Sequence, residues 1–228
     1  MKKIIFAIFA HPDDESFGCP GTIMSEIDAG ADVHLITLTA GEAGTNPDNH
    51  PDLATVRLEE WRVAGDLMKV TSQHHLGFSD GKIGNIDMIN ATSKIRHIVD
   101  EVISQHEDEL SIEFMSFELG GLTGHIDHIA ASRATAQVYY SLKSKDPRVT
   151  KLRLRCLPLE QQPEVDTGWI FMDKGYATTE IDESIDVSNY RERIIAVTKA
   201  HHTQRGDGEI HLERIAKSPR LIEDFLLR

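Results

Sequence analysis

Apolar residues in this chain gather into short unbroken runs, and segments with apolar residues three and four positions apart separate these runs. Short runs without alternation are typical of strands that are buried on both faces of a parallel sheet. Apolar spacing of three and four is typical of amphipathic helices. The runs predict strands at 4–9, 33–38, 74–78 and 112–117, and the helical spacing predicts helices over 21–29, 53–70, 86–103 and 129–142.

The alternation of strands and helices before Asp146 predicts an α/β fold. We expect a three-layer α/β/α sandwich with a mostly parallel, Rossmann-like sheet and right-handed crossovers. The sequence shows no clear linker or internal repeat, so we expect residues 1–228 to form one domain. After Asp146 the pattern is less regular: 152–157 and 168–171 resemble strands, and 190–202 and 212–227 resemble helices.

Composition narrows the class of protein. The chain has 228 residues, of which 40% are hydrophobic and 27% charged, as is ordinary for a soluble globular protein. The formal net charge of −13 argues against nucleic acids and anionic membranes as partners. Two cysteines form no disulfide framework, which favours a reducing compartment and a cytoplasmic location. A homo-oligomer is compatible with the sequence, which does not fix the oligomeric state.

The amino terminus allows a second interpretation. Met1-Lys2-Lys3 followed by the apolar run 4–9 resembles a short signal peptide. The run is at the short end for such a segment, and His11-Pro12-Asp13-Asp14 follows almost at once, so a buried strand is the favoured interpretation. No other run approaches the ~20 apolar residues of a membrane span.

Polar residues follow each of the four clearest predicted strands. They are His11–Asp14, Glu42, Asp80 and His125–His128. Parallel strands place their carboxyl ends on one edge of a sheet, and open α/β sheets bind their ligands at that edge. We therefore expect residues that are far apart in the sequence to converge there on one site.

Two imidazoles and a carboxylate in this set match a catalytic zinc site. His11 and Asp14 can ligate one ion from a tight loop, and His128 can supply the third protein ligand, with a position left for water. Asp13 lies beside the ligands and can take a proton from that water as general base. His125 shares a helix face with His128, so one can bind metal while the other faces substrate. The same ligands also suit ferrous iron.

Other polar residues have competing interpretations. Arg57 and Glu60 lie three positions apart on a predicted helix, where a surface ion pair competes with a role at the site. Asp127 is either a surface carboxylate or a partner that orients a ligating imidazole. Either His201 or His202 can line the mouth of a substrate pocket.

The sequence resembles the LmbE-like, or PIG-L, family of metal-dependent N-acetylglucosaminyl deacetylases. The resemblance rests first on Ala-His-Pro-Asp-Asp-Glu at 10–15 and Gly-His-Ile-Asp-His at 124–128. One departure is Ile126, where the family often has proline, and a helix start tolerates that exchange. Further family-like elements are Gly41–Gly44, Arg57 with Glu60, Leu76–Asp80 and Ala200–Gln204.

This resemblance implies a zinc-dependent enzyme that hydrolyses the N-acetyl group of a small amino-sugar substrate. It implies that His11, Asp14 and His128 bind zinc, and that Asp13 is the base. His125 is then expected to stabilise the oxyanion or to protonate the departing amine. The substrate contacts expected from the resemblance and from position are Glu42, Arg57, Asp80 and His202.

Three alternatives stay open at this point. One is an amidase that cleaves a larger acyl group from a glucosamine-thiol conjugate. Another is a sugar-binding relative without turnover, although a binding protein has no need of Asp13. A nucleotide-binding α/β protein is disfavoured, because no Gly-x-Gly-x-x-Gly follows the first strand.

Overall fold

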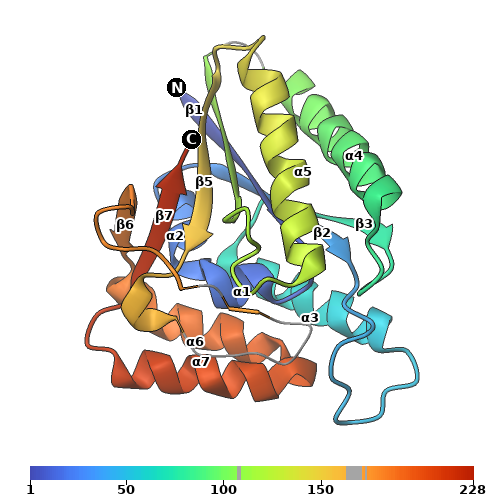
Figure 1. Cartoon of the computed structure of the whole chain (residues 1–228), viewed down its shortest axis with the longest axis vertical. Coiled ribbons are helices and arrows are strands. Elements are labelled where there is room, and N and C mark those ends of the chain that lie inside the picture. The colour runs from blue at the N-terminus through green and yellow to red at the C-terminus, as the bar shows by residue number, and fades with distance from the viewer. Residues whose placement is uncertain (107–108, 163–170, 173) are drawn as a thin grey trace.

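The computed structural model of the chain describes residues 1–106, 109–162, 171–172 and 174–228. The described residues form a seven-stranded sheet in the order β3-β2-β1-β4-β5-β7-β6 (Figure 1). The first five of these strands are parallel to one another, and β7 and β6 are antiparallel additions at one edge. The strands are β1 (Lys2–Phe9), β2 (Asp32–Thr39), β3 (Ser72–Phe78), β4 (Leu110–Phe117), β5 (Val149–Cys156), β6 (Glu183–Asp186) and β7 (Ile222–Leu227).

Strand β1 lies between β2 and β4, with both faces buried. Its Phe6 is paired in register with His34 on one side and Phe114 on the other. The chain passes from β1 to β2 in one direction and later returns to β4 on the opposite side, so the strand order reverses at β1. The crevice outside the carboxyl ends of strands at such a reversal is where open α/β sheets bind ligands.

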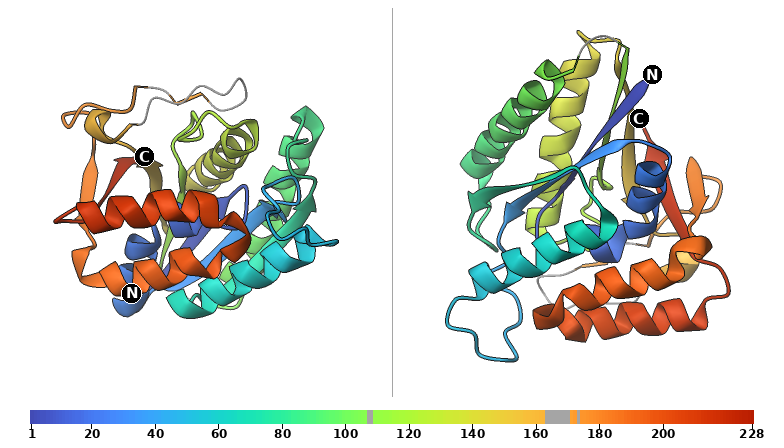
Figure 2. Two further views of the ribbon diagram at one scale, coloured as in Figure 1. Left: turned by 90° about the horizontal axis from the view of Figure 1, so that it is seen from below. Right: turned by 180° about the vertical axis from the view of Figure 1, so that it is seen from behind.

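Helices cover both faces of the sheet, which confirms the predicted three-layer sandwich. On one face lie α4 (Asn85–Ser104) and α5 (Ile126–Lys143) (Figure 1). They pack over an apolar core that includes Phe6 and Phe114. The opposite face is seen from behind in Figure 2. Its helices are α2 (Pro20–Asp28), α3 (Leu53–Met68) and α6 (Arg191–Ala200).

Two further helices lie beyond the carboxyl ends of the parallel strands. They are α1 (Asp14–Gly18), which follows β1 directly, and α7 (Arg205–Lys217), which packs beside α6 (Figure 1). Both helices therefore border the edge of the sheet where the sequence places the polar residues. Three short 3-10 turns complete the described elements, at Leu159–Gln161, Ser188–Tyr190 and His202–Gln204.

The prediction of one helix over 212–227 is wrong. Helix α7 ends at Lys217, and residues 222–227 form the strand β7 between β5 and β6. Pro219 follows the end of the helix, where its missing N–H prevents continuation. The apolar run after it is too short for its spacing to distinguish a strand from a helix.

Strand β6 was not predicted, because its sequence Glu-Ser-Ile-Asp is mainly polar and it lies at the edge of the sheet. Most of the strand predicted at 168–171 lies outside the described residues. Within the described ranges, no helix is both long enough and apolar enough to cross a membrane.

Candidate metal centre and active site

The turn after β1 is folded around the carboxylate of Asp14. Its Oδ2 accepts hydrogen bonds from the backbone N–H groups of Ala10, at 3.0 Å, and His11, at 2.9 Å. The chain thus reverses within four residues, and Asp14 becomes the first residue of α1. This turn leaves the other carboxylate oxygen, Oδ1, to face the start of α5.

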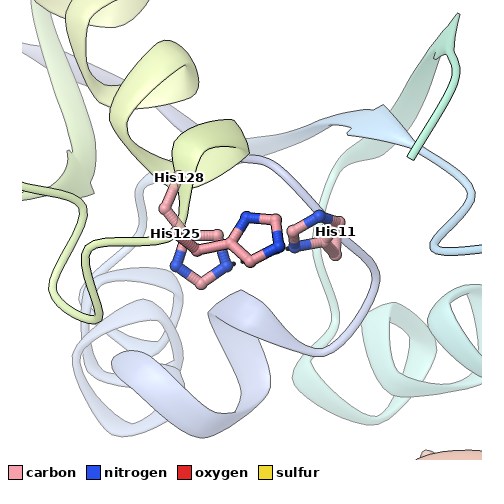
Figure 3. A group of neighbouring side chains, drawn as sticks. All are labelled: His11, His125 and His128. Carbon is pink, nitrogen blue, oxygen red and sulfur yellow. Dashed lines mark hydrogen bonds between the residues drawn. The ribbon is translucent and has the colours of Figure 1, made fainter. Parts of the chain in front are cut away.

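His11, Asp14 and His128 converge at this point, as the sequence predicts. His11 Nδ1 lies 3.1 Å from His128 Nε2, and His128 Nε2 lies 3.1 Å from Asp14 Oδ1. The distance from His11 Nδ1 to Asp14 Oδ2 is 3.6 Å. All three side chains are buried. Figure 3 shows the two histidine rings meeting, one from the loop after β1 and the other from the start of α5.

The surroundings of the His128 ring suit the tautomer that a metal ligand needs. Its Nδ1 lies 3.0 Å from the carbonyl oxygen of Gly121, which can accept the ring proton and leave Nε2 free to bind a cation. A Cβ at Gly121, whose φ is +78°, would come within 2.8 Å of the backbone of Ile129, so this close approach requires glycine.

The opposite side of the His11 ring faces two buried carboxylates. His11 Nε2 is 2.9 Å from Asp80 Oδ1 and 3.6 Å from Asp127 Oδ2. Neither contact has the alignment of a hydrogen bond, but both place negative charge where a proton on Nε2 is favoured. Burial lowers the pKa of His11, yet Asp127, Asp14 and Asp80 together raise it well above its usual value.

His11 Nδ1, His128 Nε2 and Asp14 Oδ1 therefore meet at one point of the buried site. Without a metal, the proton that the carboxylates favour on His11 can be shared with His128 Nε2; a bound cation would replace that proton and accept a lone pair from each of the three atoms. Two imidazoles and one carboxylate are also the donor set of catalytic zinc sites. The residues present thus fit a divalent metal ion.

Two other groups of side chains also have metal-ligand chemistry. The three imidazoles of His11, His125 and His128 have ligand atoms within 4.8 Å of one another, and so do His11, Asp80 and Asp127. In the second group both carboxylates accept hydrogen bonds from the backbone: Asp80 Oδ2 accepts from Ala43 N–H, and Asp127 Oδ2 accepts from Gly81 N–H. Carboxylates behind a ligating histidine normally fix its orientation, and we interpret Asp80 and Asp127 in this way.

Asp13 has a strained backbone that Arg57 holds in place. Its φ of 105° is rare for any residue but glycine and costs about 1–3 kcal/mol. Arg57 Nη2 donates to the carbonyl oxygen of Pro12 at 2.6 Å and to Asp13 Oδ2 at 2.8 Å, while Nη1 donates to Gly41 O at 2.5 Å. Burial raises the pKa of Asp13 to about 7, although Arg57 opposes the shift.

Gly41 is needed for this arrangement. Its φ is +69°, and a Cβ at this position would overlap the guanidinium of Arg57. The competing interpretation of Arg57 as a surface residue is thereby excluded, since only 4% of it is exposed. Glu60, its predicted partner, instead accepts hydrogen bonds from the backbone and hydroxyl of Thr203.

His125 is the N-cap of α5, and its ring lies 5.0 Å from those of both His11 and His128 (Figure 3). Its Nδ1 accepts a hydrogen bond from the N–H of Asp127 at 3.2 Å. Burial and the two neighbouring imidazoles lower the pKa of His125, so the ring is neutral near pH 7. With Nδ1 occupied as an acceptor, the ring proton is on Nε2, where it can be donated.

A pocket of about 590 Å³ opens onto these side chains. This volume is within the range of small-molecule sites. At one end, its walls include His11, Asp13, Asp14, His125 and His128. The predicted metal ligands, base and oxyanion partner therefore share one cavity.

The four predicted substrate contacts have different surroundings. Arg57 and Asp80 line the pocket but are engaged with Asp13 and His11, and their contact with a sugar stays a prediction. Glu42 accepts a hydrogen bond from Asp80 N–H at 2.9 Å and is not part of the described pocket lining. His202 is exposed, near Asp48, and also outside that lining.

Sequence reasoning did not find a buried network behind α1. Ser16 Oγ donates to Glu15 Oε1 at 2.6 Å, and His201 Nε2 lies 2.9 Å from the same hydroxyl. Burial raises the pKa of Glu15 to about 8 and lowers that of His201 to about 3, so both groups are neutral near pH 7. The network ties the helix that begins at Asp14 to the C-terminal end of α6.

The sequence profile of the PIG-L family, described as GlcNAc-PI de-N-acetylase, matches residues 6–139. The chain belongs to the PIG-L family. Both motifs that carry the metal-ligand candidates fall inside the matched region.

Curated relatives of this PIG-L protein are deacetylases of amino-sugar conjugates. The 1D-myo-inositol 2-acetamido-2-deoxy-alpha-D-glucopyranoside deacetylase of Mycobacteroides abscessus is 27% identical, over 88% of this chain and 81% of the relative. A probable N-acetyl-alpha-D-glucosaminyl L-malate deacetylase 2 of Bacillus subtilis is 25% identical, over 90% and 84% respectively.

A solved structure has the same fold as this chain. The N,N'-diacetylchitobiose deacetylase from Pyrococcus horikoshii superimposes with a TM-score of 0.68 at 17% identity, covering all of this chain and 84% of that one. At this identity the likeness shows the fold alone. The predicted α/β sandwich is thus confirmed both by the strand order and by a structural neighbour.

Replacing Arg57 with lysine is expected to lower kcat by about 10- to 100-fold and to leave metal content unchanged. A lysine cannot reproduce the fork of donors that holds Pro12 and Asp13 together. The matched control is Arg62→Lys on the same helix, where an exposed arginine pairs with Glu59 and Asp66 and contributes little. Equal kcat values for the two variants would show that Arg57 does not position the base.

Proposed function

We propose that this PIG-L protein is a metal-dependent hydrolase that removes the N-acetyl group from an N-acetylglucosamine-containing small molecule. The convergence of His11 Nδ1, His128 Nε2 and Asp14 Oδ1 carries the proposal, because two imidazole nitrogens and a carboxylate oxygen that meet in a buried site are the ligand set of a catalytic metal ion. We assign zinc to this site, and ferrous iron is the alternative that the same ligands accept.

Different residues around the site carry out different steps of the proposed reaction. When bound, the metal ion supplies a water of lowered pKa and polarises the amide carbonyl. Asp13, which lines the pocket with a pKa raised to about 7, accepts a proton from the attacking water. The water oxygen then bonds to the acetyl carbon.

His125 is the proton donor in this reaction. Its Nε2–H can donate a hydrogen bond to the amide carbonyl oxygen as that oxygen gains negative charge, or a proton to the amide nitrogen as the carbon–nitrogen bond breaks. The products are acetate and a free amine, so each turnover consumes one water. Arg57 holds the base, and Asp80 with Asp127 orients the His11 ring for this step.

The test is an assay of acetate release. Purified protein is incubated with N-acetylglucosaminyl L-malate and with its inositol counterpart, before and after chelation and with zinc restored. We expect acetate from at least one substrate, loss of activity after chelation and recovery with metal. Release of a larger acid from acylated glucosamine-thiol conjugates, without acetate release, would instead support the amidase alternative. Metal binding without any hydrolysis would support a sugar-binding protein.

A further inference from the structure

The pocket has a second end, which is positively charged, whereas the end at the metal centre is lined by carboxylates. Beyond Phe17 and Gly18 of α1, its walls include Arg155 from β5 and His211 and Arg214 from α7. The lining carboxylates are Asp13, Asp14 and Asp80 beside the metal centre, and Asp207 in the first turn of α7. A cationic end is notable in a chain with a net charge of −13.

Arg155 is held rigidly by main-chain oxygens rather than by a carboxylate. Its Nε donates to Gly18 O at 2.8 Å, and its Nη1 donates to the carbonyl oxygens of Cys156 and Asp224. Only 6% of the residue is exposed. None of these acceptors is a carboxylate. The buried Glu223 is near enough for Arg155 to oppose the rise that burial causes in its pKa, but both of its carboxylate oxygens already accept hydrogen bonds from the N–H groups of Gly21 and Thr22.

Arg214 has no hydrogen-bond or ion-pair partner for its guanidinium within the described residues. It is half-buried on α7, and both burial and the nearby charge of Arg155 lower its pKa. Two cations of the same sign thus share a partly desolvated wall. That arrangement costs free energy in the protein alone and is offset when an anion binds.

Helix α1 links the two ends of the pocket. Asp14 begins the helix at the metal centre, and the carbonyl of Gly18 at its other end binds Arg155. At about 1.5 Å per residue, the separation along the helix is about 6 Å, close to the length of one sugar ring. His211 stacks on Phe17 at 4.7 Å and, with a pKa lowered to about 4 mainly by burial, is a neutral donor beside the cations.

We propose that Arg155 and Arg214 form a subsite for an anionic group attached to the sugar, so that the substrate is an acidic rather than a neutral N-acetylglucosamine conjugate. This inference rests on the proposed deacetylase function. With the acetamide at the metal centre, the substituent on the far side of the ring reaches the two arginines. A carboxylate and a phosphate have the shared chemistry that this pair recognises.

The test compares kcat/KM for three N-acetylglucosamine conjugates that carry malate, phosphate or inositol. Wild-type protein is expected to favour at least one acidic conjugate over the neutral inositol conjugate by about 10-fold or more. Arg214→Gln should lower kcat/KM for the acidic conjugate by about 10- to 100-fold and change that for the inositol conjugate less than about 2-fold. Arg214→Lys, which keeps the charge, should retain part of the preference.

Lys217→Gln is the matched control, because it removes one positive charge from an exposed position of the same helix. It should leave the preference unchanged. Calorimetric titration with free malate and with inorganic phosphate gives a readout without turnover, identifies the anion, and should show weaker binding only for the Arg214 variant.

Two results would contradict the anionic subsite but not the proposed deacetylase function. One is an equal fall in kcat/KM for acidic and neutral conjugates in Arg214→Gln, and the other is a wild-type preference for the inositol conjugate. Failure to release acetate from all three conjugates would overturn both proposals. A thermal melt of each variant separates loss of binding from loss of folding.

Discussion

Asp13→Asn is expected to lower kcat for deacetylation by about 100- to 10,000-fold and to leave about one metal ion bound per chain. Asparagine keeps the shape of the side chain and can still accept the hydrogen bond from Arg57. It cannot take a proton from water, so the loss falls on the chemical step. Initial rates of acetate release, together with elemental analysis of the same preparation, measure both quantities.

The interpretation depends on metal content and folding staying constant. The strained backbone at Asp13, with φ at 105°, is a feature that asparagine tolerates better than most residues. A melting temperature close to that of wild type is therefore expected. Near-normal turnover in this variant would show that another group, such as His125, is the base.

His11→Gln is expected to abolish both metal binding and turnover. The substitution removes the proposed metal ligand His11 Nδ1, which lies 3.1 Å from His128 Nε2. It leaves only two ligands of the proposed three, and a catalytic zinc site ordinarily keeps three protein ligands. Elemental analysis should give about one metal ion per wild-type chain and close to none in the variant.

His125→Gln is the matched control for metal binding, since it alters a third imidazole of the same cluster. In our account His125 does not hold the ion, so this variant should keep its metal and lose mainly kcat. Loss of metal from His125→Gln together with retention by an Asp14→Asn variant would mean that the three histidines are the ligands. That outcome would contradict the assignment of Asp14.

The core of the site could be predicted from the sequence because its position follows from topology. His11 and His128 each follow a buried parallel strand, and neighbouring parallel strands bring their carboxyl ends together. The structure shows β1 beside β4, with the two side chains in contact. The motifs predicted which residue types could bind a metal, and the strand pattern predicted that they would lie at the same edge of the sheet.

The surroundings of the site could not be predicted in the same way. The sequence suggests a surface ion pair or a sugar contact for Arg57, but its side chain extends from α3 to the turn after β1. Long side chains cross between elements, and the spacing within one helix does not show where they end. For the same reason, sequence did not distinguish the buried His201 from the exposed His202.

The C-terminal third shows a second limit of predicting structure from sequence patterns. Residues 222–227 carry an apolar pattern that fits a helix or a strand, and their pairing with β5 and β6 decided the outcome. Strand β5 supplies Arg155, whose contacts with Gly18 and the β7 backbone depend on that pairing. A feature of the pocket thus depends on the region where sequence patterns are least informative.

The most direct test of the central claim is a crystal structure of the zinc-loaded protein, with anomalous diffraction measured at the zinc edge. We predict one strong anomalous peak per chain, within bonding distance of His11 Nδ1, His128 Nε2 and a carboxylate oxygen of Asp14. A peak bound by His125 in place of Asp14, or located away from His11 and His128, would contradict the account.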